Sequence, residues 1–421
     1  MDKFVIKGGK QLSGTVEVSG AKNSALALMP AVLLNNGVNT IDNVPEVNDI
    51  FTMMKLLRYL GVNAEFSNNK LVLDSSNIVS QDAPYKHVKK MRASVYVLGP
   101  LLSKYGYAKV SMPGGCAWGP RPINLHLEAM KKFGASIELE EGYIIAKTNR
   151  LSGARINFDI SSVGATGNAL MAAVLAKGES IITNAASEPE ITQLAEFLTS
   201  MGAKINGIGS NILEIEGVET LSACSVVNIP DRIEAGTLLI AGAMTRGKIK
   251  LANCNSKHLN LPIQKLEDSG AKLFYNNEVI EIDSTNMNPK GVNVTTAIYP
   301  GFPTDLQAQW TAYMCTVNGS SKIVDTIYLD RFKHIPELNR LGANIEMSRN
   351  SAIVKGVDKL KGATVMSTDL RASASLVLAG LVADGTTNVL RIYHIDRGYQ
   401  KIEEKLTKLG ADITRVKTED F

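Results

Sequence analysis

Six segments of the chain consist almost entirely of small and apolar residues and show no polar face at helical spacing. Thr237 to Met244 and Ser373 to Ala383 are clear examples. A helix that is apolar on every side must be buried, so the pattern predicts helices enclosed by other elements. Each segment is followed by a glycine, a short alternating strand, an amphipathic helix, a second glycine and an alternating strand pair.

The third copy shows one such unit in full. The expected elements are a helix over Ala165 to Ala176 ended by Gly178, a strand over Ser180 to Thr183, a helix over Glu190 to Leu198, and a hairpin of Lys204 to Ile205 with Ile212 to Ile215. A glycine after a helix supplies the left-handed backbone that ends it. Alternating strands around a glycine-rich turn predict the hairpin. The unit is therefore expected to be α/β.

Two series of glycines mark six copies of this unit. The series after the second helix has intervals of 68 to 73 residues and comprises Gly61, Gly134, Gly202, Gly270, Gly342 and Gly410. The series after the first helix leads it by 23 to 28 residues and comprises Gly37, Gly106, Gly178, Gly247, Gly319 and Gly385. Six repeats exceed one hydrophobic core. We therefore expect two α/β domains of three repeats each, with helices inside, sheets outside and a cleft between the domains.

The composition is that of an ordinary soluble protein, with 45% hydrophobic and 20% charged residues. A net charge of +4 is too small to indicate nucleic-acid binding. The longest apolar runs fall short of the roughly 18 residues that a membrane span needs, and the N-terminus lacks an apolar signal segment. The expectation is a cytoplasmic protein that binds neither nucleic acid nor membrane.

Candidate chemistry is concentrated in Pro113 to Pro122, which reads Pro-Gly-Gly-Cys-Ala-Trp-Gly-Pro-Arg-Pro. The glycines and prolines exclude a regular element, so Cys116 and Arg121 stand on a loop, where functional residues concentrate. An exposed turn with an incidental thiol is the alternative. The four cysteines show no CxxC spacing and the five histidines form no ligand cluster, so no metal site and no disulfide framework is expected.

The six buried helices begin in polar or charged clusters, with the cations Lys22, Arg92 and Arg371 among them. Helix N-termini bind anions, so several of them around one cleft would suit a substrate with more than one phosphate. Ordinary N-capping by Ser, Thr and Asp is the alternative for any single helix. Capping does not explain the cations, which are unfavourable at the positive end of a helix dipole unless a negative group offsets them.

Ten motifs are spread from the N-terminus to residue 398. They are Ser19–Asn23, Met91–Ser94, the Cys116 loop through His126, Ser162–Thr166, Glu188–Glu190, Pro230–Glu234, Phe302–Asp305, Asp330–Phe332, Thr368–Ser375 and Arg391–Gly398. Together they resemble the UDP-N-acetylglucosamine 1-carboxyvinyltransferases of the enolpyruvyl transferase family. The resemblance implies two inside-out domains of three βαβαββ units each. One, residues 22–229, carries the catalytic loop, and the other comprises residues 1–21 and 230–421.

The resemblance also implies an activity, with phosphoenolpyruvate and UDP-N-acetylglucosamine as substrates. The enolpyruvyl group is transferred to the sugar 3′-hydroxyl and phosphate is released, at the first committed step of peptidoglycan synthesis. The implied catalytic residues are Cys116 as proton donor or nucleophile, Asp305 as base, Asp369 in proton handling, and Lys22 and Arg397 on the phosphate. No metal or other cofactor is implied.

The implied substrate contacts come from both halves of the chain. Arg121 would hold the phosphate with Asn23 alongside, and Arg331 and Arg371 would hold the carboxylate region. The nucleotide-sugar site would comprise Arg92, Arg121, Pro122, Ile123, Asn124, Leu125, Ser162, Val163, Gly164, Asp305 and Ile327.

Three positions depart from many members of the family. Asn48 stands in place of lysine, Asn124 in place of aspartate and Leu329 in place of glutamate. None of them removes Cys116, Asp305 or a phosphate-binding cation, so an active enzyme is expected. Two alternatives stay open: a paralogue that binds nucleotide sugar without turnover, and the related transferase that acts on shikimate 3-phosphate. The Gly-Asn-Ala-Gly-Thr loop of the latter is absent here.

Overall fold

The computed structural model describes residues 2–89, 91–112 and 123–417, which divide into two compact units. The internal unit is Gly20–Ile229, and the terminal unit joins Met1–Ser19 to Pro230–Phe421. Gly20 and Ala21 belong to the internal unit, where the Asn228 amide donates to the Ala21 carbonyl at 3.0 Å. The chain therefore passes between the units twice.

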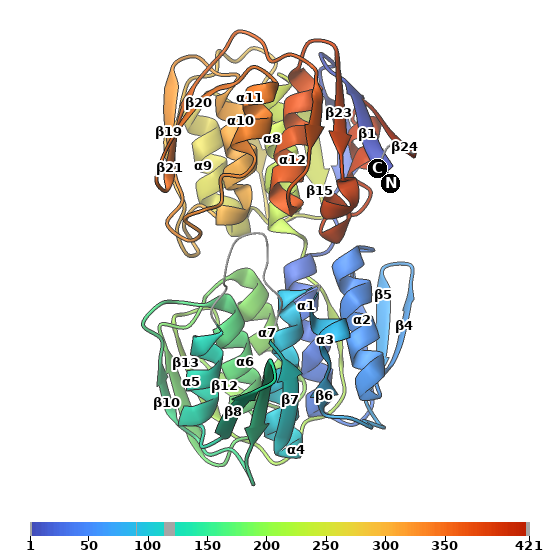
Figure 1. The fold of residues 1–421 in the computed structure, drawn as a ribbon, viewed down its shortest axis with the longest axis vertical. Helices are drawn as coiled ribbons and strands as arrows, with labels where there is room; N and C mark the ends of the chain where they lie inside the picture. The colour runs from blue at the N-terminus through green and yellow to red at the C-terminus, as the bar shows by residue number, and fades with distance from the viewer. Residues whose placement is uncertain (1, 90, 113–122, 418–421) are drawn as a thin grey trace. The chain divides into compact units, whose positions relative to one another are not determined.

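Three largely apolar helices lie at the centre of each unit, with strands around them (Figure 1). They are α1 (Lys22–Ala31), α4 (Leu98–Tyr105) and α6 (Val163–Ala173) in the internal unit, and α8 (Arg232–Met244), α10 (Gln307–Met314) and α12 (Leu370–Val382) in the terminal unit. Every residue of α10 is buried. Short 3-10 segments extend three of these helices: η1 (Val32–Leu34), η2 (Arg92–Val97) and η4 (Thr304–Leu306).

Three four-stranded sheets are formed by the described residues of the internal unit. Their strand orders are β14-β3-β5-β4, β6-β7-β9-β8 and β10-β11-β13-β12. The first pair in each is parallel and the other two pairs are antiparallel. The strands are β3 (Val38–Asp42), β4 (Asn63–Ser67), β5 (Lys70–Asp74), β6 (Asp82–Ala83), β7 (Tyr107–Ser111), β8 (Ser136–Glu140), β9 (Tyr143–Lys147), β10 (Arg155–Asn157), β11 (Glu179–Thr183), β12 (Lys204–Asn206), β13 (Ile212–Glu216) and β14 (Ser225–Val227).

The N-terminal residues complete two sheets of the terminal unit. β1 (Asp2–Lys7) lies between β23 and β24, antiparallel to both, and β2 (Ser13–Glu17) is parallel to β15. The sheet orders are β16-β17-β15-β2, β18-β19-β21-β20 and β22-β23-β1-β24. The remaining strands are β15 (Lys248–Ala252), β16 (Lys272–Tyr275), β17 (Val279–Asp283), β18 (Val294–Thr295), β19 (Ser320–Val324), β20 (Asn344–Ser348), β21 (Ser351–Lys355), β22 (Thr364–Met366), β23 (Thr386–Leu390) and β24 (Asp412–Lys417).

Amphipathic helices pack between the sheets, and each unit has its own hydrophobic core. These helices are α2 (Asn48–Leu60), α5 (Asn124–Lys132), α7 (Pro189–Ser200), α9 (Asn260–Asp268), α11 (Ile335–Arg340) and α13 (Ile402–Lys408), and shorter segments are α3 (Tyr85–Val88), η3 (Ser256–Leu259) and η5 (Ile392–Arg397). The predicted fold class is confirmed: each unit is an inside-out α/β body of three repeats.

The helix boundaries differ in detail from those that the glycines predict. α6 runs from Val163 to Ala173, because Ser162 Oγ accepts a hydrogen bond from the Ala165 amide at 3.3 Å and starts the helix earlier. Gly178 (φ 93°) turns the chain into β11 instead of capping α6, whereas Gly106 (φ 69°) caps α4 directly. The prediction that Gly178 ends the third central helix is therefore wrong.

One glycine pair in the third repeat gives a stability prediction. Gly217 donates its amide to the Gly178 carbonyl at 3.0 Å, and a Cβ on Gly217 would lie 1.6 Å from the Ala176 carbonyl oxygen. We expect Gly217→Ala to lower the free energy of unfolding by about 2–3 kcal/mol, as overpacking does. Gly178→Ala is the control, since its Cβ would meet nothing within 4 Å and only the left-handed backbone costs about 1 kcal/mol. Equal urea midpoints for the two variants would contradict the close-approach argument.

Candidate active site

One cluster of charge in the terminal unit is Asp305 held between two arginines. Asp305 Oδ1 lies 2.7 Å from Arg331 Nη1, and Oδ2 lies 2.7 Å from Arg371 Nη2. Arg331 and Arg371 are buried, whereas Asp305 is partly exposed. Both carboxylate oxygens therefore accept a charge-assisted hydrogen bond from a different guanidinium.

Three separate segments position this cluster. Asp305 lies in η4 at the start of α10, Arg371 lies in the first turn of α12, and Arg331 lies in the loop between β19 and α11. The loop is shaped by Asp325, whose Oδ1 accepts from the amides of Ile327 and Tyr328 at 2.9 Å each. Asp325 is therefore a structural residue that orients the loop carrying Arg331.

Thr304 connects the loop to the ion-pair cluster. Its hydroxyl donates to Asp325 Oδ2 at 2.7 Å and accepts from Arg331 Nη1 at 3.0 Å. The structural role of Asp325, which is fully buried, was not predicted from the sequence. The available signal was an aspartate directly after a predicted strand, a position that favours side-chain hydrogen bonds to the following backbone.

The two guanidiniums decide the charge state of Asp305. Burial by itself raises the pKa of a carboxyl group, but the charges and hydrogen bonds of Arg371 and Arg331 outweigh it and hold the pKa of Asp305 well below 3.8. Burial lowers the pKa of Arg371 and the charge of Asp305 raises it, with a net rise. Asp305 is therefore ionised at neutral pH and is a weaker base than an ordinary carboxylate.

Asp369 caps a helix. Its Oδ1 accepts from the backbone amides of Arg371 and Ala372 at 2.9 and 3.1 Å, and its Oδ2 accepts from the Thr368 hydroxyl at 3.0 Å. Asp231 caps α8 in the same way, and Ser162 caps α6. Ordinary N-capping, the alternative to anion binding, thus explains the polar start of these three helices. A further role of Asp369 in proton handling stays a prediction.

In the internal unit, Lys22 is the first residue of α1, where no side chain caps the helix. Its ammonium lies 3.2 Å from Asp49 Oδ2, and both side chains are buried. The cation at the positive end of α1 is therefore offset by a carboxylate from the first turn of α2. Asn23, beside it, is exposed.

Asn168 joins the segments that carry the predicted nucleotide-sugar residues. This fully buried amide accepts from the Gly99 amide at 2.8 Å and donates to the Val95 carbonyl at 2.9 Å. It also lies 2.8 Å from His126 Nδ1. It thereby connects α6, the segment after Arg92 and the helix that begins at Asn124.

The His126 ring lies directly under the start of α6. A Cβ on Gly164 would lie 3.1 Å from the ring, so only glycine fits there without displacement. Burial, with Arg92 nearby, lowers the pKa of His126 to about 3. The ring is therefore neutral, and because Asn168 donates to Nδ1, the ring proton is on Nε2. No role of His126 or Asn168 was predicted from the sequence.

The predicted site residues are distributed over both units. Lys22, Asn23, Arg92, Ile123, Asn124, Leu125, Ser162, Val163 and Gly164 belong to the internal unit, and Asp305, Ile327, Arg331, Asp369, Arg371 and Arg397 belong to the terminal unit. Arg397 is the last residue of η5, and Ile327 is partly exposed in the loop that Asp325 shapes. Cys116, Arg121 and Pro122 lie outside the described residues, as does Trp118.

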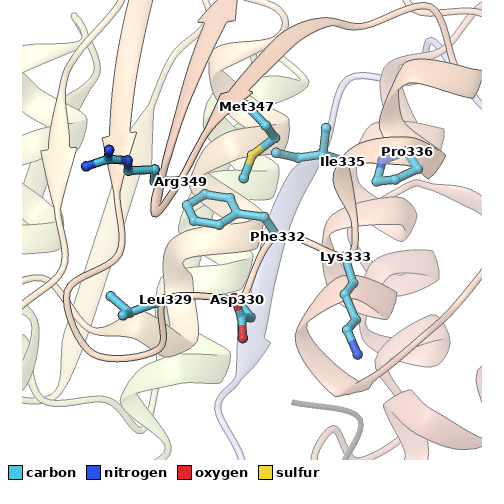
Figure 2. Close-up of a pocket in the computed structure, with 8 residues that line it drawn as sticks. All are labelled: Leu329, Asp330, Phe332, Lys333, Ile335, Pro336, Met347 and Arg349. Carbon is cyan, nitrogen blue, oxygen red and sulfur yellow. The ribbon is translucent and has the colours of Figure 1, made fainter. Parts of the chain in front are cut away.

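A hollow of about 280 Å³ lies beside the Arg331 loop (Figure 2). Phe332, Ile335 and Met347 form its apolar wall, with Asp330 and Lys333 at one side. Leu329, one of the departures from the family, stands at its edge and is 59% exposed. The lining includes both neighbours of Arg331 but not Arg331 itself, whose guanidinium contacts Asp305.

No described helix is long and apolar enough to span a membrane.

Comparison with known proteins agrees with the repeats and motifs. The family described as EPSP synthase (3-phosphoshikimate 1-carboxyvinyltransferase) matches residues 6–406. UDP-N-acetylglucosamine 1-carboxyvinyltransferases from Chloroherpeton thalassium and Chlorobium limicola are 57% and 55% identical, over the whole of this chain and at least 99% of theirs. The crystal structure of the enolpyruvyl transferase NikO from Streptomyces tendae is similar with a TM-score of 0.89 and 25% identity, over 99% of each chain.

A more distant structure shares the fold alone. EPSP synthase from Acinetobacter baumannii superposes with a TM-score of 0.77 at 17% identity, over 99% of this chain and all of the other. The full-length identity to the carboxyvinyltransferases is much higher. The chain therefore belongs to the enolpyruvyl transferase family, among the UDP-N-acetylglucosamine 1-carboxyvinyltransferases.

Proposed function

We propose that this protein transfers the enolpyruvyl group of phosphoenolpyruvate to the 3′-hydroxyl of UDP-N-acetylglucosamine and releases phosphate. The named relatives, identical at 52% or more over full length, support these substrates. The observation that carries the proposal is the convergence of Arg331 and Arg371 on one carboxylate. A pair of guanidiniums that holds Asp305 has the charge and geometry to hold the carboxylate of an acidic substrate. The place of action would be the cytoplasm, in peptidoglycan synthesis.

The reaction is an addition followed by an elimination. A proton is added to the methylene carbon of phosphoenolpyruvate, and the sugar hydroxyl loses its proton as its oxygen bonds to C2. Loss of phosphate from C2 and of a methyl proton then restores the double bond on the product. Cys116 is the proposed donor of the first proton, or the nucleophile that adds to C2, and Asp305 is the proposed base for the hydroxyl. Asp369 is proposed to handle the proton of the elimination.

Binding of the substrate would change the environment of Asp305. While both guanidiniums contact it, Asp305 is a weak base. A substrate carboxylate that competes for Arg331 and Arg371 would withdraw part of their charge and raise the basicity of Asp305. Recognition of the acid and activation of the base would then be coupled through the same two side chains.

The remaining substrate contacts follow the family assignment. Lys22, Arg121 and Arg397 would hold the phosphate with Asn23, and the Lys22–Asp49 ion pair keeps the ammonium at the start of α1. Arg92, Arg121 to Leu125, Ser162 to Gly164 and Ile327 would line the nucleotide-sugar site. The buried contacts of Asn168 and His126 support this assignment, because they hold the starts of α5 and α6 together.

The proposal is tested by phosphate release from the purified protein with phosphoenolpyruvate and UDP-N-acetylglucosamine. We expect turnover with this pair and none when shikimate 3-phosphate replaces the nucleotide sugar. Nucleotide-sugar binding without phosphate release would identify a non-catalytic paralogue. Release with shikimate 3-phosphate alone would assign the protein to the other transferase.

Asp305→Asn should lower kcat by about 10²- to 10⁴-fold, the usual contribution of a general base. The variant also leaves two buried guanidiniums without their carboxylate, so we expect it to be less stable at pH 7. Because the folded pKa of Asp305 is depressed, its stabilisation is complete above the unfolded value near 3.9 and decreases as the pH falls further. The stability difference from the wild type should therefore narrow below about pH 4.

Asp305→Glu separates the two effects of that substitution. It keeps a carboxylate for Arg331 and Arg371 but displaces the base, so we expect near-normal thermal stability with strongly reduced turnover. Full activity of Asp305→Asn would exclude Asp305 as the base.

Cys116→Asp tests the role of the thiol. If Cys116 is mainly a general acid, this variant should retain turnover with its optimum at lower pH, because an aspartic acid is protonated only there. A pH–rate profile of phosphate release measures the shift. Loss of activity at every pH would favour obligatory covalent attachment instead.

A further inference from the structure

Tyr399 lies in a polar cluster at the centre of the terminal unit and is almost completely buried. Its hydroxyl oxygen is 3.2 Å from Arg371 Nη1, 3.1 Å from Gln309 Nε2 and 2.9 Å from Thr237 Oγ1. Thr237 belongs to α8, Gln309 to α10 and Arg371 to α12. The hydroxyl therefore contacts all three central helices of the unit.

Two of the donors in the cluster can be identified. Arginine can only donate, and the Gln309 amide nitrogen is identified by its bond to the Asp305 carbonyl oxygen at 2.9 Å, which can only accept. The Tyr399 oxygen thus accepts from Arg371, and the second proton of the Gln309 nitrogen lies between the Tyr399 hydroxyl and Thr237 Oγ1, each at 3.1 Å. The two hydroxyls share a further hydrogen bond, and Thr237 Oγ1 also lies 2.7 Å from the Ile233 carbonyl oxygen.

Arg371 is consequently held by two different acceptors. Nη2 donates to the Asp305 carboxylate, and Nη1 donates to the neutral Tyr399 hydroxyl. The guanidinium carbon also lies 5.5 Å from the centre of the Tyr399 ring. A substrate anion would compete with Asp305 for the first contact, whereas the second lies among buried groups.

Gln309 links the same cluster to the backbone of Asp305. One amide nitrogen contacts both the Tyr399 hydroxyl and the Asp305 carbonyl. The Gln309 side chain therefore helps to position both Asp305, which it contacts directly, and Arg371, which it reaches through Tyr399.

We infer that Tyr399 is a positioning residue for the reaction: its hydroxyl keeps Arg371 in place when the substrate carboxylate displaces Asp305 from that guanidinium. The inference rests on the proposed function. Burial raises the pKa of Tyr399, so the hydroxyl stays protonated and acts as a hydrogen-bonding group, not in proton transfer. Of these two residues it is Arg371 that contacts the substrate, and Tyr399 acts through it.

The test compares Tyr399→Phe with Tyr313→Phe. Tyr313 is a matched control, since it is fully buried in the same unit and its hydroxyl contacts Ser269 Oγ at 2.8 Å, away from Asp305. A hydrogen bond to a charged group contributes about 1.5–3 kcal/mol, so Tyr399→Phe should lower kcat/KM for phosphoenolpyruvate by about 10- to 100-fold. The KM for UDP-N-acetylglucosamine should change by less than about twofold. Tyr313→Phe should leave both constants near the wild-type values.

A double variant decides whether Tyr399 acts through Arg371. Tyr399→Phe combined with Arg371→Lys should be no worse than Arg371→Lys alone, because the lysine no longer makes the lost contact. The inference would be overturned if the losses of kcat/KM in the double variant were multiplicative, or if Tyr399→Phe had wild-type kinetics. It would also be overturned if both tyrosine variants lost activity equally and in step with their melting temperatures.

Calorimetric titration of phosphoenolpyruvate distinguishes failure of this inference from failure of the proposed function. A wild-type protein that binds phosphoenolpyruvate but releases no phosphate contradicts the proposed function only. Weaker binding by Tyr399→Phe than by Tyr313→Phe would still support the positioning role. A wild-type protein that neither binds nor turns over phosphoenolpyruvate overturns both.

Discussion

The three central helices of each unit are largely apolar and buried, and the arrangement of the rest of the unit follows from enclosing them. One amphipathic helix and one four-stranded sheet per repeat cover only part of this surface, so three repeats are needed to close it. The need to enclose the central helices also explains the path of the N-terminal residues. β1 fills the place that the second hairpin strand occupies in other repeats, and β2 adds the parallel edge strand beside β15.

A core of apolar helices leaves few places for polar groups. In the terminal unit the buried polar residues of these helices include Thr237, Gln309 and Arg371, with Asp305 just before α10. Buried polar groups are stable only when their hydrogen-bonding capacity is used. The Asp305 ion pairs and the Tyr399 hydroxyl meet that requirement, and the same contacts would hold a substrate-binding guanidinium beside the proposed base.

The internal unit meets the same physical requirement with different residues. Lys22 is offset by Asp49, and Asn168 connects its neighbours to His126. The repeats are thus alike in their apolar positions and glycines, and unlike in the polar residues at the helix starts. Such a division allows one scaffold to present a different set of charged groups in each unit.

Much of the fold could be predicted from the sequence, because burial along a helix or strand leaves a local period. The apolar segments at α8 and α12, the hairpin of β12 and β13 and the six repeats all follow from such patterns. The predicted end of α6 was wrong, because a glycine at position 178 is compatible both with a helix cap and with a turn into a strand. The chain alone does not distinguish the two.

The candidate site could be predicted only as a set of residue types. The sequence shows cations at helix starts and predicts that negative groups offset them, but the partners stand 27 and 66 positions away, at Asp49 and Asp305. Their pairing depends on how separate repeats pack, and so do the buried contacts of Tyr399. The sequence by itself determined the repeats, the buried helices and the chemical groups available. The tertiary structure alone decided which of those groups meet, because a hydrogen bond requires an approach within about 3 Å that no local pattern encodes.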